Sequence, residues 1–172
     1  MKKSYIISFI IGCVSILCSC STMYYVNKNE KFTRSKASQI AAEHGNAFFV
    51  EYGIATWSYL WFYTDSTVVL NKLVNGKMTH TQQYPSINRD FDLKAITNDS
   101  IKALYNDVER HTPTVLDSGL IEFIITNQGK ELEAAYVVDV EKFTNQQYDH
   151  PLLNEIARIL KTYSLLSGEI WP

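Results

Sequence analysis

The residues with the most distinctive chemistry are three cysteines, all within the first 20 positions. They lie in or directly after an apolar run from Tyr5 to Leu17, which follows Lys2-Lys3. A basic start, an apolar segment of about a dozen residues and a small residue before a cut describe a secretory signal peptide. The run is too short for a membrane-spanning helix, which needs about 20 apolar residues. The chemistry of this segment therefore depends on which thiol stays with the mature chain.

The position of the cut is indicated by the four residues Leu17-Cys18-Ser19-Cys20. Leu at −3, Ser at −1 and Cys at +1 closely resemble the lipobox of bacterial lipoproteins. This resemblance implies cleavage before Cys20, a thioether-linked diacylglycerol on its sulfur and usually an acylated new N-terminus. We therefore predict that residues 1–19 are a lipoprotein signal peptide and that Cys20 is the lipidation site.

The other two cysteines fit a lipobox less well. Cys18 would have Leu17 at −1, where a small residue is needed, and Cys13 interrupts the apolar segment too early. The alternatives are an ordinary signal peptide cut near Ser19 or Ser21, or an uncleaved anchor. After cleavage at the lipobox no second cysteine remains, so the mature chain cannot form an internal disulfide and depends on its core.

Composition limits the partners of the mature chain, residues 20–172, which has the length of one domain. Loss of Lys2 and Lys3 with the signal leaves 14 of the 16 basic residues against 18 acidic ones, a net charge of −4. The charges are dispersed without the basic stripe of a nucleic-acid binder, so we expect no nucleic-acid partner and attachment to the membrane through the lipid. Hydrophobic content of 46% is sufficient for a packed core.

Hydrophobic periodicity and turn residues predict short elements in the first half of the chain. Residues 20–34 are expected to form a tether, with an early edge strand as the alternative for 21–31. A helix over 35–44 is closed by Gly45, and a strand follows over 48–52. A three-stranded meander, with Asn75-Gly76 as a type I′ turn, is then predicted over residues 57–64, 67–73 and 77–84.

The second half predicts a helix from about Asp99 to His111, because apolar residues recur there at i, i+3, i+4 and i+7. A hairpin over 120–126 and 130–140 follows, and a last helix begins at Pro151 and runs to about Leu166. Hairpins with tight turns and helices between them favour an α+β fold. We predict a single two-layer domain over 35–172, with an antiparallel sheet of two hairpin or meander units and two main helices packed on one face.

Four segments between Trp57 and Tyr163 support a second resemblance. They are the hairpin Tyr63-Thr64-Asp65-Ser66, a helix with Ser100-Ile-Lys-Ala-Leu-Tyr, a strand pair over Ile121–Lys130 and a closing helix at Leu152–Ile156. Their order is similar to that in small lipoproteins of Bacteroidetes-type bacteria that carry a C-terminal domain of unknown function. This chain departs from them at Ser66, where such hairpins often have Gly. The resemblance implies the fold and the anchoring, and it brings no catalytic residues.

The other side chains that do chemistry form no recognisable constellation in the sequence. Asp90 and Asp92 point to the same side if extended and could share Ca²⁺ or act as acid and base, although such pairs are more often a solvated strand face. We therefore predict no catalytic site, no metal and no cofactor. The four histidines lack metal-ligand spacing and are given structural roles: His44, His80, His111 and His150.

The best candidate for a binding surface is one face of the predicted strand over 57–64, the aromatic row Trp57, Tyr59, Trp61 and Tyr63. If helices cover this face, the row is core, which the sequence favours because large aromatic side chains anchor small sheets. If helices cover the face of Leu60 and Phe62 instead, the rings make an exposed platform that stacks on sugars or receives a partner.

The sequence therefore predicts a non-enzymatic, lipid-anchored cell-envelope protein that binds an envelope protein or glycan. The alternatives are a periplasmic inhibitor or immunity-type protein, and an enzyme acting on glycan or lipid with carboxylates around Asp90, Asp92 or Glu51. Ser21 differs from the Asp that retains lipoproteins in the inner membrane of enteric bacteria, and no acidic export signal follows Cys20. We expect an outer-membrane location facing the periplasm, with the cell surface as the alternative.

Overall fold

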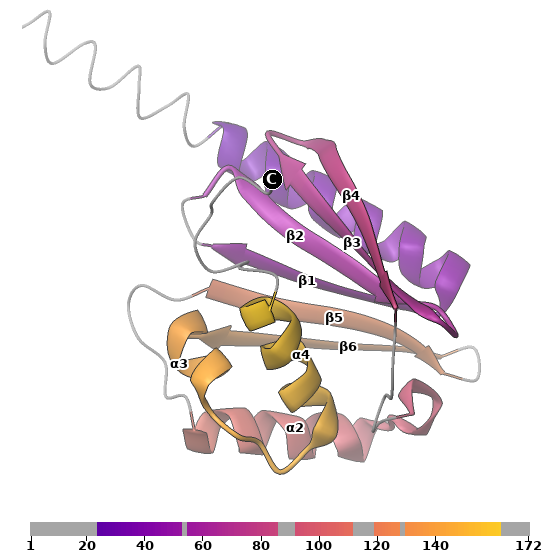
Figure 1. Cartoon of the computed structure of the whole chain (residues 1–172), viewed down its shortest axis with the longest axis vertical. Helices are drawn as coiled ribbons and strands as arrows, with labels where there is room; N and C mark the ends of the chain where they lie inside the picture. Colours follow the sequence, from indigo (N-terminus) through magenta and orange to yellow (C-terminus); the bar gives the residue numbers. More distant parts are fainter. Residues whose placement is uncertain (1–23, 53–54, 86–91, 112–118, 128–129, 163–172) are drawn as a thin grey trace, which may run out of the picture.

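The computed structural model describes residues 24–52, 55–85, 92–111, 119–127 and 130–162. These residues form one six-stranded antiparallel sheet and helices, so the predicted α+β class and antiparallel sheet are confirmed (Figure 1). The elements in chain order are a helix over residues 24–44, here called the N-terminal helix, β1 (Asn46–Tyr52), β2 (Trp57–Tyr63), β3 (Thr67–Val74), β4 (Lys77–Pro85), η1 (Leu93–Ala95), α2 (Asn98–His111), β5 (Gly119–Asn127), β6 (Lys130–Val138), α3 (Val140–Asn145) and α4 (Pro151–Thr162).

The sheet is built from the two predicted strand units, joined by one further strand. Its order is β4-β3-β2-β1-β5-β6. β2, β3 and β4 form the meander, and β5 and β6 form the hairpin. β1 connects the units because Phe48 is paired with Trp61 on β2 and with Phe123 on β5. The turn between β3 and β4 has φ values of 52° at Asn75 and 73° at Gly76, as the predicted type I′ turn requires.

Helices cover both faces of the sheet. Phe48 and Trp61 belong to a core cluster shared with α2, α3 and α4, whereas Phe49 and Leu60 belong to a cluster shared with the N-terminal helix. The strands β1 and β2 are apolar on both faces, so each face needs a cover to exclude water. The two predicted main helices, α2 and α4, do pack on one face, and the N-terminal helix adds a cover on the other. The uninterrupted apolar run of β2 from Tyr59 to Tyr63 was the sequence signal for that second cover.

The N-terminal helix includes the stretch that the sequence assigned to a tether. Residues 24–34 are helical and continue without a break to residue 44, so the alternative of an early edge strand is wrong for residues 24–31. Thr33 is buried, and its Oγ1 lies 2.6 Å from Oγ of Ser58 on β2. Ser35, where the predicted helix began, is therefore inside the helix. Gly45 ends the helix as predicted, with φ 76° and its N–H donating to the Ala41 carbonyl at 2.7 Å.

The opposite face is covered by the two predicted main helices and by one that was missed. Leu104 of α2 and Leu152 of α4 are fully buried in the larger core cluster. α2 is capped by Thr97, whose Oγ1 accepts from the Ser100 N–H at 3.2 Å, so the helix begins at Asn98, close to the predicted Asp99. α3 replaces the expected end of strand 130–140, because the Asp139 side chain accepts from the Lys142 N–H at 3.1 Å and starts a helical turn.

Candidate functional site

Two of the residues singled out in the sequence lie outside the described part of the chain. Cys20 precedes the first described residue, and Asp90 falls in the gap before residue 92. Asp92 is described and has a local role. Its Oδ1 accepts from the Lys94 N–H at 2.9 Å and caps the short helix η1.

The aromatic row is core and does not form an exposed platform. Tyr59 and Trp61 are fully buried, Tyr63 is 2% exposed, and Trp57 is half-buried at the end of the row. The Trp61 ring stacks on Phe48 with centroids 5.8 Å apart. The rings face α2, α3 and α4, which exclude water from this side of the sheet. The aromatic row is therefore part of the core and is not an exposed binding surface.

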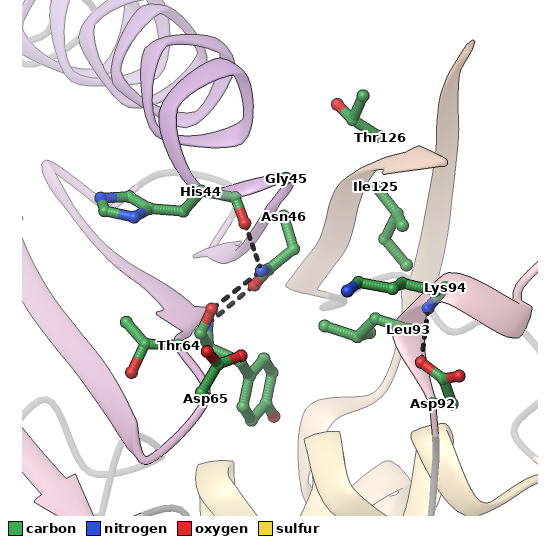
Figure 2. A pocket seen from close by; sticks show the side chains of 11 residues that line it. His44, Gly45, Asn46, Thr64, Asp65, Asp92, Leu93, Lys94, Ile125 and Thr126 are labelled. Atoms are coloured by element: carbon green, nitrogen blue, oxygen red, sulfur yellow. Dashed lines mark hydrogen bonds between the residues drawn. The ribbon is translucent and has the colours of Figure 1, made fainter. Parts of the chain in front are cut away.

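One hollow lies at the end of the sheet where the N-terminal helix meets β1 (Figure 2). It has a volume of about 740 Å³. One wall comes from the helix end and the β2–β3 turn, and the other comes from η1 and β5. Its lining residues are His44, Gly45, Asn46, Tyr63, Thr64, Asp65, Asp92, Leu93, Lys94, Ile125 and Thr126.

Asn46 fixes the floor of this hollow. Its amide nitrogen donates to the carbonyl oxygens of His44 at 3.1 Å and Tyr63 at 2.9 Å, and its Oδ1 accepts from the Tyr63 N–H at 2.7 Å. The His44 ring stacks on Phe62 with centroids 4.3 Å apart, and Figure 2 shows it turned away from Lys94. Lys94 extends into the hollow from the other wall, facing the side that carries Asp65. This lining suits a ligand that forms hydrogen bonds.

A second hollow lies beside the N-terminal helix, where the helix leaves the outer face of β5 and β6 uncovered. It has a volume of about 490 Å³ and is lined by Arg34, Glu122, Ile124 and Ala135 among others. Arg34 and Glu122 form a two-point ion pair across it, with nitrogen–oxygen distances of 2.5 and 2.6 Å. The pair connects the N-terminal helix to β5.

Glu51 is a carboxylate whose pKa is altered by its surroundings. It lies on the β1 face that the N-terminal helix covers, and its Oε1 is buried without a hydrogen-bond partner. Burial raises the pKa of Glu51 to about 7, and the carboxylates of Glu30 and Glu122 raise it further while Arg34 lowers it. Glu51 is not among the lining residues of either hollow. Its altered pKa therefore comes from burial under a helix rather than from an accessible cleft.

Two of the histidines lie close to a buried aspartate that joins α2 to α4. Asp107 is 3% exposed, and its Oδ2 accepts from the His150 N–H at 3.1 Å. His111 donates from Nδ1 to the Asp107 carbonyl oxygen at 2.8 Å, and the same nitrogen lies 3.2 Å from Oδ1. Because Asp107 is buried, its contact with His111 is not a surface pair. This arrangement holds helices together.

His150 makes the stability of α4 dependent on pH. Its Nδ1 accepts from the Leu152 N–H at 3.2 Å, so this cap requires the neutral ring. Burial lowers the pKa of His150, although Asp107 opposes this. Because the folded-state pKa lies below the unfolded value near 6.5, the cap contributes fully above about pH 6.5. Its contribution is lost as the pH falls through the lower folded-state pKa.

We therefore expect a His150→Asn variant to lose less stability than the parent chain between pH 7 and pH 5, by about 0.5–1 kcal/mol. Asparagine keeps a side-chain acceptor for the Leu152 N–H and does not titrate. The measurement is urea unfolding of both chains at the two pH values. Carboxylates elsewhere affect both chains equally, so the difference between them isolates the cap. Parallel losses in the two chains would contradict this role for His150.

No protein family matches this chain. A scan of family models found no match, and neither curated proteins nor solved structures gave one. Among the described residues, no three His, Cys, Asp or Glu side chains are grouped to hold a metal ion. No helix within the described ranges is long and apolar enough to cross a bilayer.

Of the residues that line the two hollows, Asp92, Tyr63 and His44 were singled out from the sequence, and most of the others were missed. Arg34 and Glu122 are 88 positions apart, and only the packing of the N-terminal helix beside β5 brings them together. Asn46 looks like an ordinary polar residue after a helix. Glu51 was detectable, because a single carboxylate stands in the apolar run from Ala47 to Tyr52.

Proposed function

We propose that this chain is a lipid-anchored cell-envelope protein, of the kind found as small lipoproteins in Bacteroidetes-type bacteria, whose domain acts by binding rather than by catalysis. The observation that carries the proposal is Leu17-Cys18-Ser19-Cys20 after a basic start and an apolar run. The acyl chains on Cys20 would hold the protein at the membrane, since each buried methylene contributes about 0.8 kcal/mol.

The position of the domain in the chain supports this proposal. The described helical residues begin at Tyr24, four positions after Cys20, so the domain would lie directly at the membrane surface. We place it on the periplasmic side of the outer membrane, with the cell surface as the alternative. An envelope protein or glycan is the proposed partner, and the hydrogen-bonding lining of the larger hollow, with Asn46 and Lys94, is compatible with a glycan.

The anchoring is tested by a Cys20→Ala variant of the full chain. We expect the parent to be found in the membrane fraction and the variant to be lost from it, because no thiol remains at the cleavage site. Cys18→Ala is the matched control and is expected to stay with the membrane. Intact mass of the parent reports the diacylglyceryl group directly. A Cys20→Ala protein that still partitions with membranes would refute the lipid anchor.

The binding role is tested by affinity purification from solubilised envelopes, with glycan binding measured in parallel. Lys94→Ala in the larger hollow and Ala135→Arg beside the Arg34–Glu122 pair serve as paired surface variants, because both positions are exposed. We expect one of them to abolish partner recovery and the other to retain it. Purified protein that recovers no partner and instead hydrolyses envelope glycan or lipid would favour an enzyme. Sensitivity of a deletion strain to a toxin encoded next to the gene would favour an inhibitor or immunity protein.

A further inference from the structure

Large apolar side chains are exposed at the end of the domain where the N-terminal helix begins. Tyr24 is 62% exposed and Tyr25 is 42% exposed, and their rings form an edge-to-face pair with centroids 5.4 Å apart. Met78, at the start of β4, is 41% exposed. Tyrosine is enriched where proteins meet the headgroup layer of a membrane, because its ring is apolar and its hydroxyl is polar.

The β3–β4 turn lies against the first turns of the N-terminal helix. The Gly76 N–H donates to Oδ1 of Asn29 at 3.1 Å. Gly76 also lies against the methylenes of Lys28, because a Cβ built on it would come within 2.9 Å of that side chain. Lys77 and Met78 follow directly in the chain and are exposed. The fold thus places the turn that precedes Lys77 and Met78 against Lys28, about one helical turn after Tyr24 and Tyr25, and Figure 1 shows this turn beside the described start of the helix.

The distance along the chain keeps this end near the anchor. Tyr24 lies four positions after Cys20, and an extended chain covers at most about 3.6 Å per residue. A lipid on the Cys20 sulfur is therefore attached within about 15 Å of the start of the helix. If the apolar segment that ends at Leu17 instead stays in the membrane as an uncleaved anchor, the connection to Tyr24 is only a few residues longer.

We propose that this end of the domain, formed by Tyr24, Tyr25, Lys28, Lys77 and Met78 and here called the membrane-facing end, rests on the bilayer interface. The two tyrosines and the methionine lie among the headgroups, and the lysines face anionic phosphates. A lysine near an anionic surface strengthens binding by roughly fivefold. This inference rests on the proposed function, which attaches the protein to a membrane. It adds the orientation in which the domain is held at that membrane.

The test is quenching of tryptophan emission by lipids brominated near the headgroup end of their acyl chains. The full chain is expressed with its own N-terminus, purified in detergent and reconstituted into phosphatidylcholine vesicles that contain a minor share of phosphatidylglycerol. Tyr24→Trp places a new fluorophore at the membrane-facing end. Tyr105→Trp is the matched control, because Tyr105 is 52% exposed on α2, which lies on the other side of the molecule in Figure 1. The parent chain supplies the background from its own tryptophans.

We expect brominated lipid to remove much of the emission that Tyr24→Trp adds and none of that added by Tyr105→Trp. If each variant emits equally in brominated and in ordinary vesicles, the proposed orientation is overturned. Intact mass of the same samples tests the anchoring separately. Quenching at position 24 without a lipid on Cys20 supports the orientation and refutes the lipid anchor. A lipidated chain whose emission at position 24 is not quenched supports the lipid anchor and overturns the orientation. A chain that stays out of the vesicle fraction overturns both the anchor and the orientation.

Discussion

Replacing Trp61 by alanine is expected to lower the free energy of unfolding by about 3–5 kcal/mol, the largest effect we predict for one substitution. Trp61 is fully buried in the middle of β2, where it stacks on Phe48 and packs in the cluster covered by α2, α3 and α4. Its removal leaves a cavity between sheet and helices that the surrounding side chains cannot fill. Since small domains are stable by only about 5–15 kcal/mol, the variant is expected to be near its unfolding limit.

Two matched variants separate the size of the ring from its polar atom. Trp61→Phe keeps an aromatic ring and removes Nε1, which is buried without a hydrogen-bond partner, so it is expected to cost less than half as much as alanine. Trp57→Ala, at the half-buried end of the row, is expected to cost about 1 kcal/mol. Urea unfolding followed by circular dichroism measures all three. A Trp61→Ala variant no less stable than Trp57→Ala would show that the row is not the core.

At pH 8, Glu51→Gln is expected to make the protein more stable than the parent chain. The folded-state pKa of Glu51 is about 7, against 4.5 for the ordinary group, so the folded chain binds this proton more tightly than the unfolded chain. The stability that comes from the neutral carboxyl is complete below about pH 4.5 and is lost as the pH rises through about 7. Glutamine is neutral at every pH and avoids that loss.

The magnitude follows from the pKa difference after allowance for solvent. A shift of this size corresponds to about 3 kcal/mol for a fully buried group. Glu51 is only partly buried, and solvent screening reduces the expected gain to about 1–2 kcal/mol. The charged groups that set the value are Arg34 and Glu30 on the N-terminal helix and Glu122 on β5. At pH 5 the parent carboxyl is already neutral, so the two chains are expected to differ little.

Thermal unfolding of parent and variant at pH 5 and pH 8 measures this effect. Glu122→Gln is the control, because it removes one partner of the Arg34 ion pair and is expected to destabilise the protein at pH 8. An increase in stability from both substitutions would indicate that general negative charge, rather than the burial of Glu51, sets the pH dependence. Equal effects of Glu51→Gln at both pH values would refute the raised pKa.

Local patterns in the sequence predicted most of the elements. The Asn75-Gly76 turn, the 3.6-residue period of α2 and the proline at the start of α4 each depend on a few neighbouring residues, and the structure confirms them. The N-terminal helix was only half predicted, because its first turns carry polar residues such as Asn29 and Thr33 in place of an apolar stripe. These two side chains are buried, where both form hydrogen bonds with Ser58 and Asn29 also accepts one from the β3–β4 turn. Such contacts depend on tertiary structure and leave no periodic signal.

The candidate site was less predictable than the fold. The aromatic row had a clear pattern, but its exposure depended on which face the helices would cover. Asn46 and Lys94 line the larger hollow only because β1 and η1 meet at one end of the sheet. A hollow formed by loops and strand ends from distant segments has no fixed spacing in sequence. Glu51 was identified by its type, while its pKa required the neighbouring carboxylates and the helix that covers it.

The central place of β1 has a consequence for the order in which the domain folds. The meander and the β5–β6 hairpin each bring together strands that are close in sequence. The β1–β5 pairing, in which Phe48 is opposite Phe123, closes a much longer loop and carries a larger entropic cost. We expect the two strand units to form first and to join at β1 last. Until they join, the edges of β1 and β5 are open to other chains, so slow joining would favour aggregation over folding.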